Sequence, residues 1–212
     1  MTTTTIPAAS EPHAASIADQ FTRQAALFAA APALHAQAAL NVLVDAARPL
    51  ATDTVLDVAC GPGSVVLAFA KRVHGAAGLD ATAAMLEQAR QAAEKSNTQN
   101  VTWHQGSVYA LPFDDGVFDI VSCRFAFHHL ERPAEAFAEM VRVCRSGGRI
   151  VLCDAVASDD VLKPKRSIVW NVFAIPPRLN FARWPFWWTC SVPPVCPRPK
   201  CTLIRCPLNA NA

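Results

Sequence analysis

Between Asp53 and Val156 the chain alternates short apolar runs with helix-patterned segments, and this alternation restricts its fold more than any other feature. The apolar runs predict five buried strands, at residues 53–60, 75–80, 101–105, 116–124 and 147–156. Segments with helical spacing separate several of them, at residues 64–73, 81–95 and 133–145. Strands that alternate with helices predict a doubly wound, mostly parallel sheet with helices on both faces, so the fold class is α/β.

Two helical segments precede the first strand. An apolar stripe from Ile17 to Phe28 predicts a helix over residues 16–30, and a second helix is expected over residues 33–47. Residues 1–15, rich in Thr, Ala and Pro, are expected to form a disordered leader. Since 212 residues suit one α/β domain and are too few for two, we assign residues 16–160 to a single domain with an N-terminal helical lid.

The composition of the chain changes at about Asp160. Residues 1–160 carry 17 acidic and 11 basic side chains, whereas residues 161–212 carry 8 basic side chains and no acidic one. The later segment also holds 9 of the 16 Pro and 4 of the 5 Trp residues. Its four Cys residues lack the closely spaced pairs typical of zinc sites, and its prolines oppose an amphipathic membrane helix. No metal site is therefore predicted.

A shifted reading frame explains this tail better than a functional module does. Read one base out of frame, the codons for residues 169–176 permit the segment MERLRDP, and those for residues 183–191 permit a run typical of an amphipathic helix. We therefore expect residues 161–212 to be a non-native, basic frameshift product. The sheet is then truncated after the fifth strand.

Targeting signals are not evident in the sequence. The first 20 residues lack the basic and apolar regions of a signal peptide, and no apolar run approaches the roughly 20 residues that a bilayer span requires. We expect a cytoplasmic protein without stable membrane insertion and without nucleic-acid binding. The oligomeric state is not predicted.

The segment VLDVACGPGS places two glycines directly after the first strand. Ligands of doubly wound sheets bind at the carboxyl ends of the strands, and glycines there let the backbone approach a ligand closely. A nucleotide-type cofactor is expected. The dinucleotide fingerprint G-x-G-x-x-G is incomplete, because its third glycine is replaced by Val66, and this disfavours an NAD(P)-dependent oxidoreductase without excluding one.

Four motifs in order give the chain a family resemblance over residues 19–160. They are VLDVACGPGS, AAGLDATAAMLEQAR, VTWHQGSVYALPFDDGVFDIVSCRFAFHHL and EMVRVCRSGGRIVLCD. Together they resemble the class I S-adenosylmethionine-dependent methyltransferases, in particular the branch of the ubiquinone/menaquinone C-methyltransferases. The resemblance implies a Rossmann-like methyltransferase fold with strand order 3-2-1-4-5-7-6, S-adenosylmethionine as cofactor and a small-molecule methyl acceptor.

The resemblance also implies which residues bind the cofactor. Asp80 ends the second strand and is expected to bind the ribose hydroxyls, and Ser107 stands where the family usually has an Asp that accepts from the adenine amino group. The remaining positions would border the methionine portion, the adenine pocket and the lid: Asp57, Ala59, Gly61, Gly63, Met85, Val108, Phe21 and Gln24.

Candidate catalytic groups follow the fourth strand. His128 and His129 could take a proton from the acceptor, because imidazole titrates near neutrality, or they could be structural. Arg124 could bind an anionic substrate or form a surface ion pair. We expect a methyltransferase, which the altered tail could impair. A catalytically inactive cofactor-binding or interaction protein is the alternative outside the enzymes.

Overall fold

The computed structural model describes residues 11–31, 35–156, 167–174 and 204–206. Its centre is a sheet in which five strands run parallel, in the order β3-β2-β1-β4-β5. Their bounds are β1 Thr54–Val58, β2 Gly75–Asp80, β3 Val101–Gln105, β4 Phe118–Arg124 and β5 Cys144–Val156. The doubly wound parallel sheet predicted from the alternating pattern is confirmed.

Two further strands extend the sheet beyond β5. They are β6 (Ser167–Ala174), which lies antiparallel along β5, and β7 (Ile204–Cys206), which lies antiparallel along β6. The run SIVWNVFA of β6 is rich in β-branched and aromatic residues, and the open edge of β5 offers backbone groups to pair with it. The expected truncation after the fifth strand holds for the parallel strands only, because β6 and β7 continue the sheet, and β6 occupies the place that the family order gives to strand seven.

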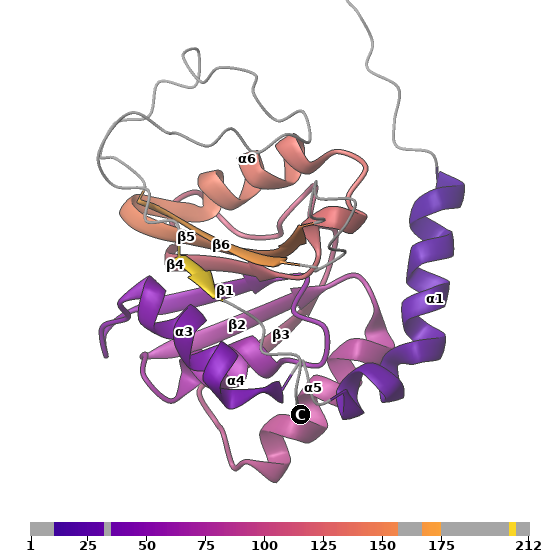
Figure 1. Cartoon of the computed structure of the whole chain (residues 1–212), viewed down its shortest axis with the longest axis horizontal. Coiled ribbons are helices and arrows are strands. Elements are labelled where there is room, and N and C mark those ends of the chain that lie inside the picture. The colour runs from indigo at the N-terminus through magenta and orange to yellow at the C-terminus, as the bar shows by residue number, and fades with distance from the viewer. Residues whose placement is uncertain (1–10, 32–34, 157–166, 175–203, 207–212) are drawn as a thin grey trace, which may run out of the picture.

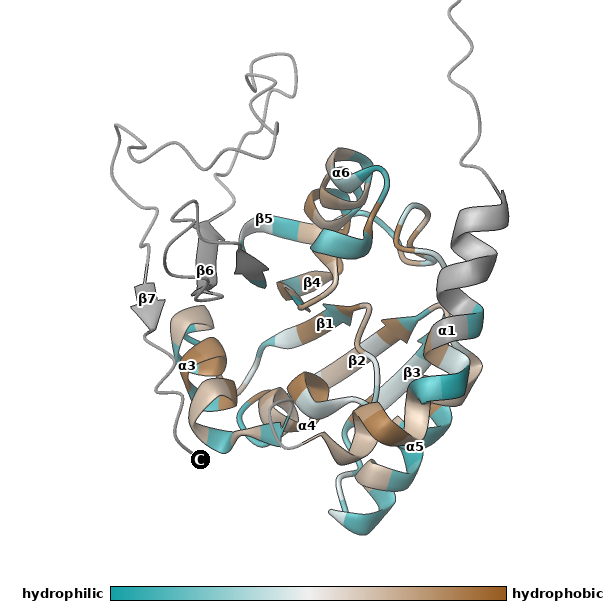
Figure 2. Cartoon of the chain, turned by 45° about the vertical axis from the view of Figure 1, so that its right-hand side comes forward, coloured by the Kyte–Doolittle hydropathy of each residue, from teal (hydrophilic) through white to brown (hydrophobic). Residues whose placement is uncertain are grey.

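Helices cover both faces of the parallel sheet. Figure 1 shows α6 on one side and α3, α4 and α5 on the other. Successive side chains of β1 point to opposite faces of the sheet. Val55 packs in the hydrophobic core on the side of α3 and α4, and Leu56 packs in the core on the side of α6. Both hydrophilic and apolar residues occur on α5 and α6 in Figure 2, as expected of helices with one face on a sheet. The helices are α1 Glu11–Ala30, α3 Gln37–Ala47, α4 Ser64–Ala70, α5 Ala83–Lys95, η1 Phe127–His129 and α6 Pro133–Val143.

The first helix begins earlier than the sequence pattern predicts. It starts at Glu11 and not at Ser16, so residues 11–15 are helical and the expected leader is too long by these five residues. A glutamate suits the positive end of a helix, proline is tolerated in the first turn, and alanine has the highest helix propensity. Residues 1–10 lie outside the described residues.

Most of the tail also lies outside the part of the chain that the structure describes, so the boundary at Asp160 and the frameshift remain predictions. None of the helices in the described ranges combines the length and apolar character needed to cross a bilayer.

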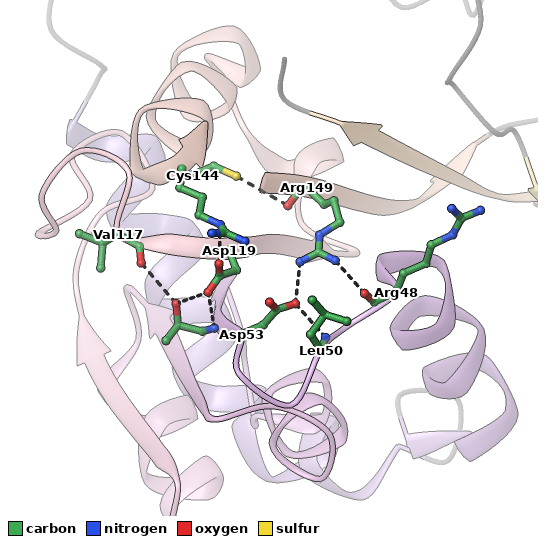
Figure 3. A network of polar contacts seen from close by, with 9 residues as sticks. Arg48, Leu50, Asp53, Val117, Asp119, Cys144 and Arg149 are labelled. Atoms are coloured by element: carbon green, nitrogen blue, oxygen red, sulfur yellow. Dashed lines mark hydrogen bonds and ion pairs between the residues drawn. The ribbon is translucent and has the colours of Figure 1, made fainter. Parts of the chain in front are cut away.

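A network of hydrogen bonds and ion pairs lies at the end of the sheet opposite the glycine turn (Figure 3). The carboxylate of Asp53, only 2% exposed, accepts hydrogen bonds from Arg149 at 2.6 Å and from the Leu50 backbone N–H at 2.9 Å. A second nitrogen of Arg149 donates to the Arg48 carbonyl at 2.7 Å. This network ties β5 to the loop between α3 and β1, and it leaves the carboxyl ends of the strands free for a ligand site.

Candidate functional site

A cavity of about 650 Å³ lies at the carboxyl ends of β1, β2 and β4. The turn after β1 and the end of β2 supply one wall, and Phe21 and Phe28 of α1, with residues around η1, supply another. Most of the predicted site residues meet here. Those that line the cavity are Phe21, Asp57, Ala59, Gly61, Asp80, Met85, Ser107, Val108, Arg124 and His129.

The turn after β1 has the left-handed backbone that its glycines permit. Gly61 has φ of +52°, and the position of a Cβ there would have no atom within 4 Å, so a ligand can approach its backbone. Ala59 has φ of +56°, which is uncommon for a residue with a side chain and indicates local strain at the cavity wall.

Gly63 has another role. It is absent from the residues that line the cavity, and a Cβ at this position would come within 2.6 Å of the Trp103 ring. Its φ of +82° also places it at the left-handed N-cap of α4. A glycine at position 63 therefore lets the turn before α4 pack closely against β3, and the cofactor contact expected for Gly63 stays a prediction.

Asp80 is fixed at the end of β2 by two backbone donors. Its Oδ2 accepts a hydrogen bond from the Gly61 N–H at 2.9 Å, and its Oδ1 accepts one from the Thr82 N–H at 2.8 Å. Burial raises the pKa of this carboxyl, although both hydrogen bonds act against the rise. Each oxygen keeps further lone pairs, so the carboxylate is oriented and can still accept from a diol.

Asp57 is the most deeply buried acid of the cavity. It is 2% exposed, and burial raises its pKa from the ordinary 3.8 to about 7. The Ser122 hydroxyl donates to its Oδ1 at 2.7 Å, and this bond and the charge of Arg124 partly oppose the rise. Near neutral pH this carboxyl is therefore poised between its neutral and ionised forms. A cation in the cavity would favour the ionised form.

Three further predicted residues line the cavity from α5 and from the segment after β3. Met85 is buried on α5, and Ser107 and Val108 follow β3. The Ser107 hydroxyl accepts a hydrogen bond from the Tyr109 backbone N–H at 3.2 Å, so it is partly engaged within its own turn. It retains one proton to donate and one lone pair.

The helical lid contributes rings more than polar groups. The Phe21 ring lies 5.4 Å from both the Phe28 ring and the His129 ring, measured between centroids. Gln24 is half-buried on the same helix, but it does not line the cavity. Helical spacing places Gln24 on the same side of α1 as Phe21 and Phe28, and its contact with the cofactor, which the family resemblance implies, stays a prediction.

The two histidines differ in position. His129 lines the cavity, whereas His128 accompanies Asp154, whose carboxylate bonds to its Nδ1 at 2.6 Å and to its backbone N–H at 3.0 Å. The two imidazole centroids lie 3.9 Å apart. Burial, together with the neighbouring His128, lowers the pKa of His129 below its ordinary 6.5. His129 is therefore neutral at pH 7 and can accept a proton.

Several residues in or near the cavity were not identified from the sequence. Thr82 occupies the N-cap of α5, but its side chain makes no cap hydrogen bond and instead interacts with the Asp80 carboxylate. Asp154 could have been identified by the rule that found Asp80, because both acids lie toward the ends of their strands. Tyr109 and Arg132 carry no comparable signal, since only the folded chain brings these two loop residues together.

The described residues contain no group of three or more His, Cys, Asp or Glu side chains that could hold a metal ion. The cavity therefore offers carboxylates, imidazole, guanidinium groups and aromatic rings for binding and proton transfer.

The segment that supplies most of the cavity lining is similar to known proteins. Residues 56–152 match the family model described as a methyltransferase domain. The chain is 38% identical over 121 residues to the uncharacterized methyltransferase YcgJ of Bacillus subtilis, a match that covers 57% of this chain and 48% of the relative. It is 36% identical over 117 residues to the ubiquinone/menaquinone biosynthesis C-methyltransferase UbiE of a Ruegeria strain, covering 54% and 47%.

Solved structures agree with these sequence matches. The crystal structure of YcgJ superposes with a TM-score of 0.55 over 57% of this chain and 52% of that one. The structure of a methyltransferase from Bacillus halodurans, also 38% identical, gives the same TM-score over the same shares. The chain spans about half the length of the curated relatives that it matches.

Proposed function

We propose that the chain moves a methyl group from S-adenosylmethionine to a small-molecule acceptor in the cavity, on the premise that residues 56–152 match the methyltransferase domain family. The observation that carries the proposal is the wall formed by β1 and β2. There the oriented carboxylate of Asp80 accepts from the backbone of Gly61, beside open space at the glycine.

The residues present suit this cofactor. Asp80 provides acceptors for ribose hydroxyls, Met85 an apolar surface for adenine, and Ser107 a hydroxyl in place of the usual carboxylate. Asp57 suits the positive end of the molecule, because a cation relieves the unfavourable burial of an ionised carboxylate. When bound, S-adenosylmethionine supplies a methyl group already activated by its sulfonium. The protein then has mainly to position the reactants.

The chain's own residues would orient the acceptor and exclude water. Phe21, Phe28 and Phe125 present apolar rings to the cavity, and such rings exclude water from it. His129 would accept the proton that an acceptor hydroxyl loses, because the imidazole lines the cavity and is neutral at pH 7. Asp154 would hold the adjacent His128 in place.

The experiment is to incubate the full chain with methyl-tritiated S-adenosylmethionine and a small-molecule extract of bacterial cells. Transfer of label into the organic-extractable fraction supports the proposal, and Asp80→Asn should abolish it. Asp45→Asn, which removes an exposed acid paired with Arg72, is the matched control and should keep it. Binding of cofactor without any transfer of label would favour an inactive binder, and binding of NADH would favour an oxidoreductase.

A further inference from the structure

The cavity extends past the residues assigned to the cofactor, toward the loop before α6 and the end of β4. Two guanidinium groups, those of Arg124 and Arg132, line this part together with the rings of Tyr109 and Phe125. Two guanidinium groups in one part of the cavity suit an anionic ligand better than a neutral one, because hydrogen bonds to an ionised group are the stronger ones.

Arg132 is fixed by its neighbours, but one of its N–H groups has no acceptor among the described residues. Its guanidinium lies 4.4 Å from the centre of the Tyr109 ring, and its backbone N–H donates to the Tyr109 hydroxyl at 3.4 Å. One terminal nitrogen pairs with Glu135 at 2.5 Å. The Nε atom is buried and has no hydrogen-bond partner among the described residues. A buried N–H without an acceptor is unfavourable, and a bound oxygen would satisfy it.

Arg124 is more deeply buried than Arg132. It is 9% exposed, and its guanidinium lies 4.5 Å from the centre of the Phe125 ring and hydrogen-bonds the Cys153 side chain. Phe125 has φ of +57°, a conformation that costs energy for a bulky residue and that places its ring in the cavity. Burial lowers the pKa of Arg124, which is the sign of a cation that an added anion would stabilise.

Acids also line the cavity, and they limit where an anion can bind. Asp57 and Asp80 lie on the cofactor wall, and Glu131 lies beside Arg132. Arg124 already interacts with the charge of Asp57, so the more favourable place for an anion is beside Arg132, with Arg124 as a second cation in the cavity wall.

We propose that the methyl acceptor is a largely apolar molecule with one anionic group, a carboxylate or a phosphate monoester, bound by Arg132 and Arg124. The apolar body packs on the rings of Phe21, Phe28, Phe125 and Tyr109. Calling this ligand the methyl acceptor rests on the proposed function, but the preference of the cavity for an anion can be measured without any methyl transfer.

The experiment compares 2-naphthoate with its uncharged isostere 2-naphthamide, by calorimetry on the full chain with and without S-adenosylhomocysteine. Charge-assisted hydrogen bonds contribute about 1.5–3 kcal/mol, so the acid should bind roughly tenfold more tightly or better. Arg132→Gln should reduce the preference to about twofold or less. Arg90→Gln, an exposed arginine of α5, is the matched control and should keep it.

Three results would overturn the inference: equal affinity for the two probes, a preference that survives Arg132→Gln, and failure of both probes to bind. Arg124→Gln serves as a second test, with thermal unfolding to check the fold, and Arg132→Gln remains decisive if the buried variant unfolds. S-adenosylmethionine affinity is measured in parallel. Equal weakening of the cofactor and of the acid in Arg132→Gln would assign the arginine to the cofactor instead. A chain that prefers the acid but transfers no label would refute the proposed function and leave this inference standing.

Discussion

Replacing Asp57 by Asn should stabilise the folded protein at neutral pH while weakening its function. The ionised carboxylate is unfavourable in the buried site, since its pKa rises from 3.8 to about 7 on folding. A difference of about three pKa units corresponds to a free energy on the order of 4 kcal/mol, at 1.36 kcal/mol per unit. Asn keeps the size of the side chain and an oxygen that can accept from Ser122.

The sign of the pH dependence follows from proton binding. Between about pH 4 and pH 7 the folded state holds a proton on Asp57 that the unfolded state has lost, so this group lowers the stability of the wild type as pH rises through that window. Above about pH 7 the loss is complete. The stability advantage of Asp57→Asn should therefore grow from near zero at acid pH to its full value near pH 8.

Urea denaturation of both proteins across this pH range measures the difference, in which contributions of the other groups cancel. Ser122→Ala is the informative control, because loss of its hydrogen bond raises the pKa of Asp57 further and moves the transition to higher pH. A difference between Asp57→Asn and wild type that stays constant with pH would show that Asp57 titrates normally. The reasoning about its burial would then be wrong.

Three further changes test other parts of the structure. Gly63→Ala should destabilise the fold by about 1–3 kcal/mol through overpacking. The loss should exceed that of Gly147→Ala, because Gly147 shares the positive φ but has open space for a Cβ. Equal losses of stability in thermal unfolding would contradict the packing explanation. Arg149→Met should cost about 3–5 kcal/mol in urea unfolding, because it leaves the Asp53 carboxylate buried and unpaired, yet cofactor affinity measured by calorimetry should not change. His129→Gln should lower the methyl-transfer rate by about 100-fold or more. The wild type should lose activity as pH falls below 6.5 and His129 becomes protonated, and the variant should not show this loss. A pH–rate profile of unchanged shape would exclude His129 as the base.

The elements of the parallel sheet could be predicted because their signals are local. Each strand is an apolar run bounded by turns, and β2 and β3 begin and end at the predicted residues. The approach of Gly61 to Asp80 was also predictable in outline. Parallel strands bring their carboxyl ends to one edge of the sheet, so residues that follow β1 and β2 must meet there.

Interactions between distant segments were not predictable in this way. The requirement for glycine at position 63 comes from Trp103, forty positions along the chain, and no local pattern indicates that contact. The partner of His128 is Asp154, and the side chain stacked on Tyr109 is Arg132, so each pair depends on the packing of α6 and β5. The early start of α1 has a local cause, because Pro is tolerated in the first turn of a helix even though it is also typical of a disordered leader.

The most direct test of the account is a calorimetric titration of the full chain with S-adenosylmethionine. One molecule should bind per chain, and Asp80→Asn should weaken binding by about 10- to 100-fold through the loss of charge-assisted hydrogen bonds, whereas Asp45→Asn should not change it. Absence of binding to a folded chain, or an affinity that Asp80→Asn leaves unchanged, would contradict the assignment of this cavity to a methyl donor.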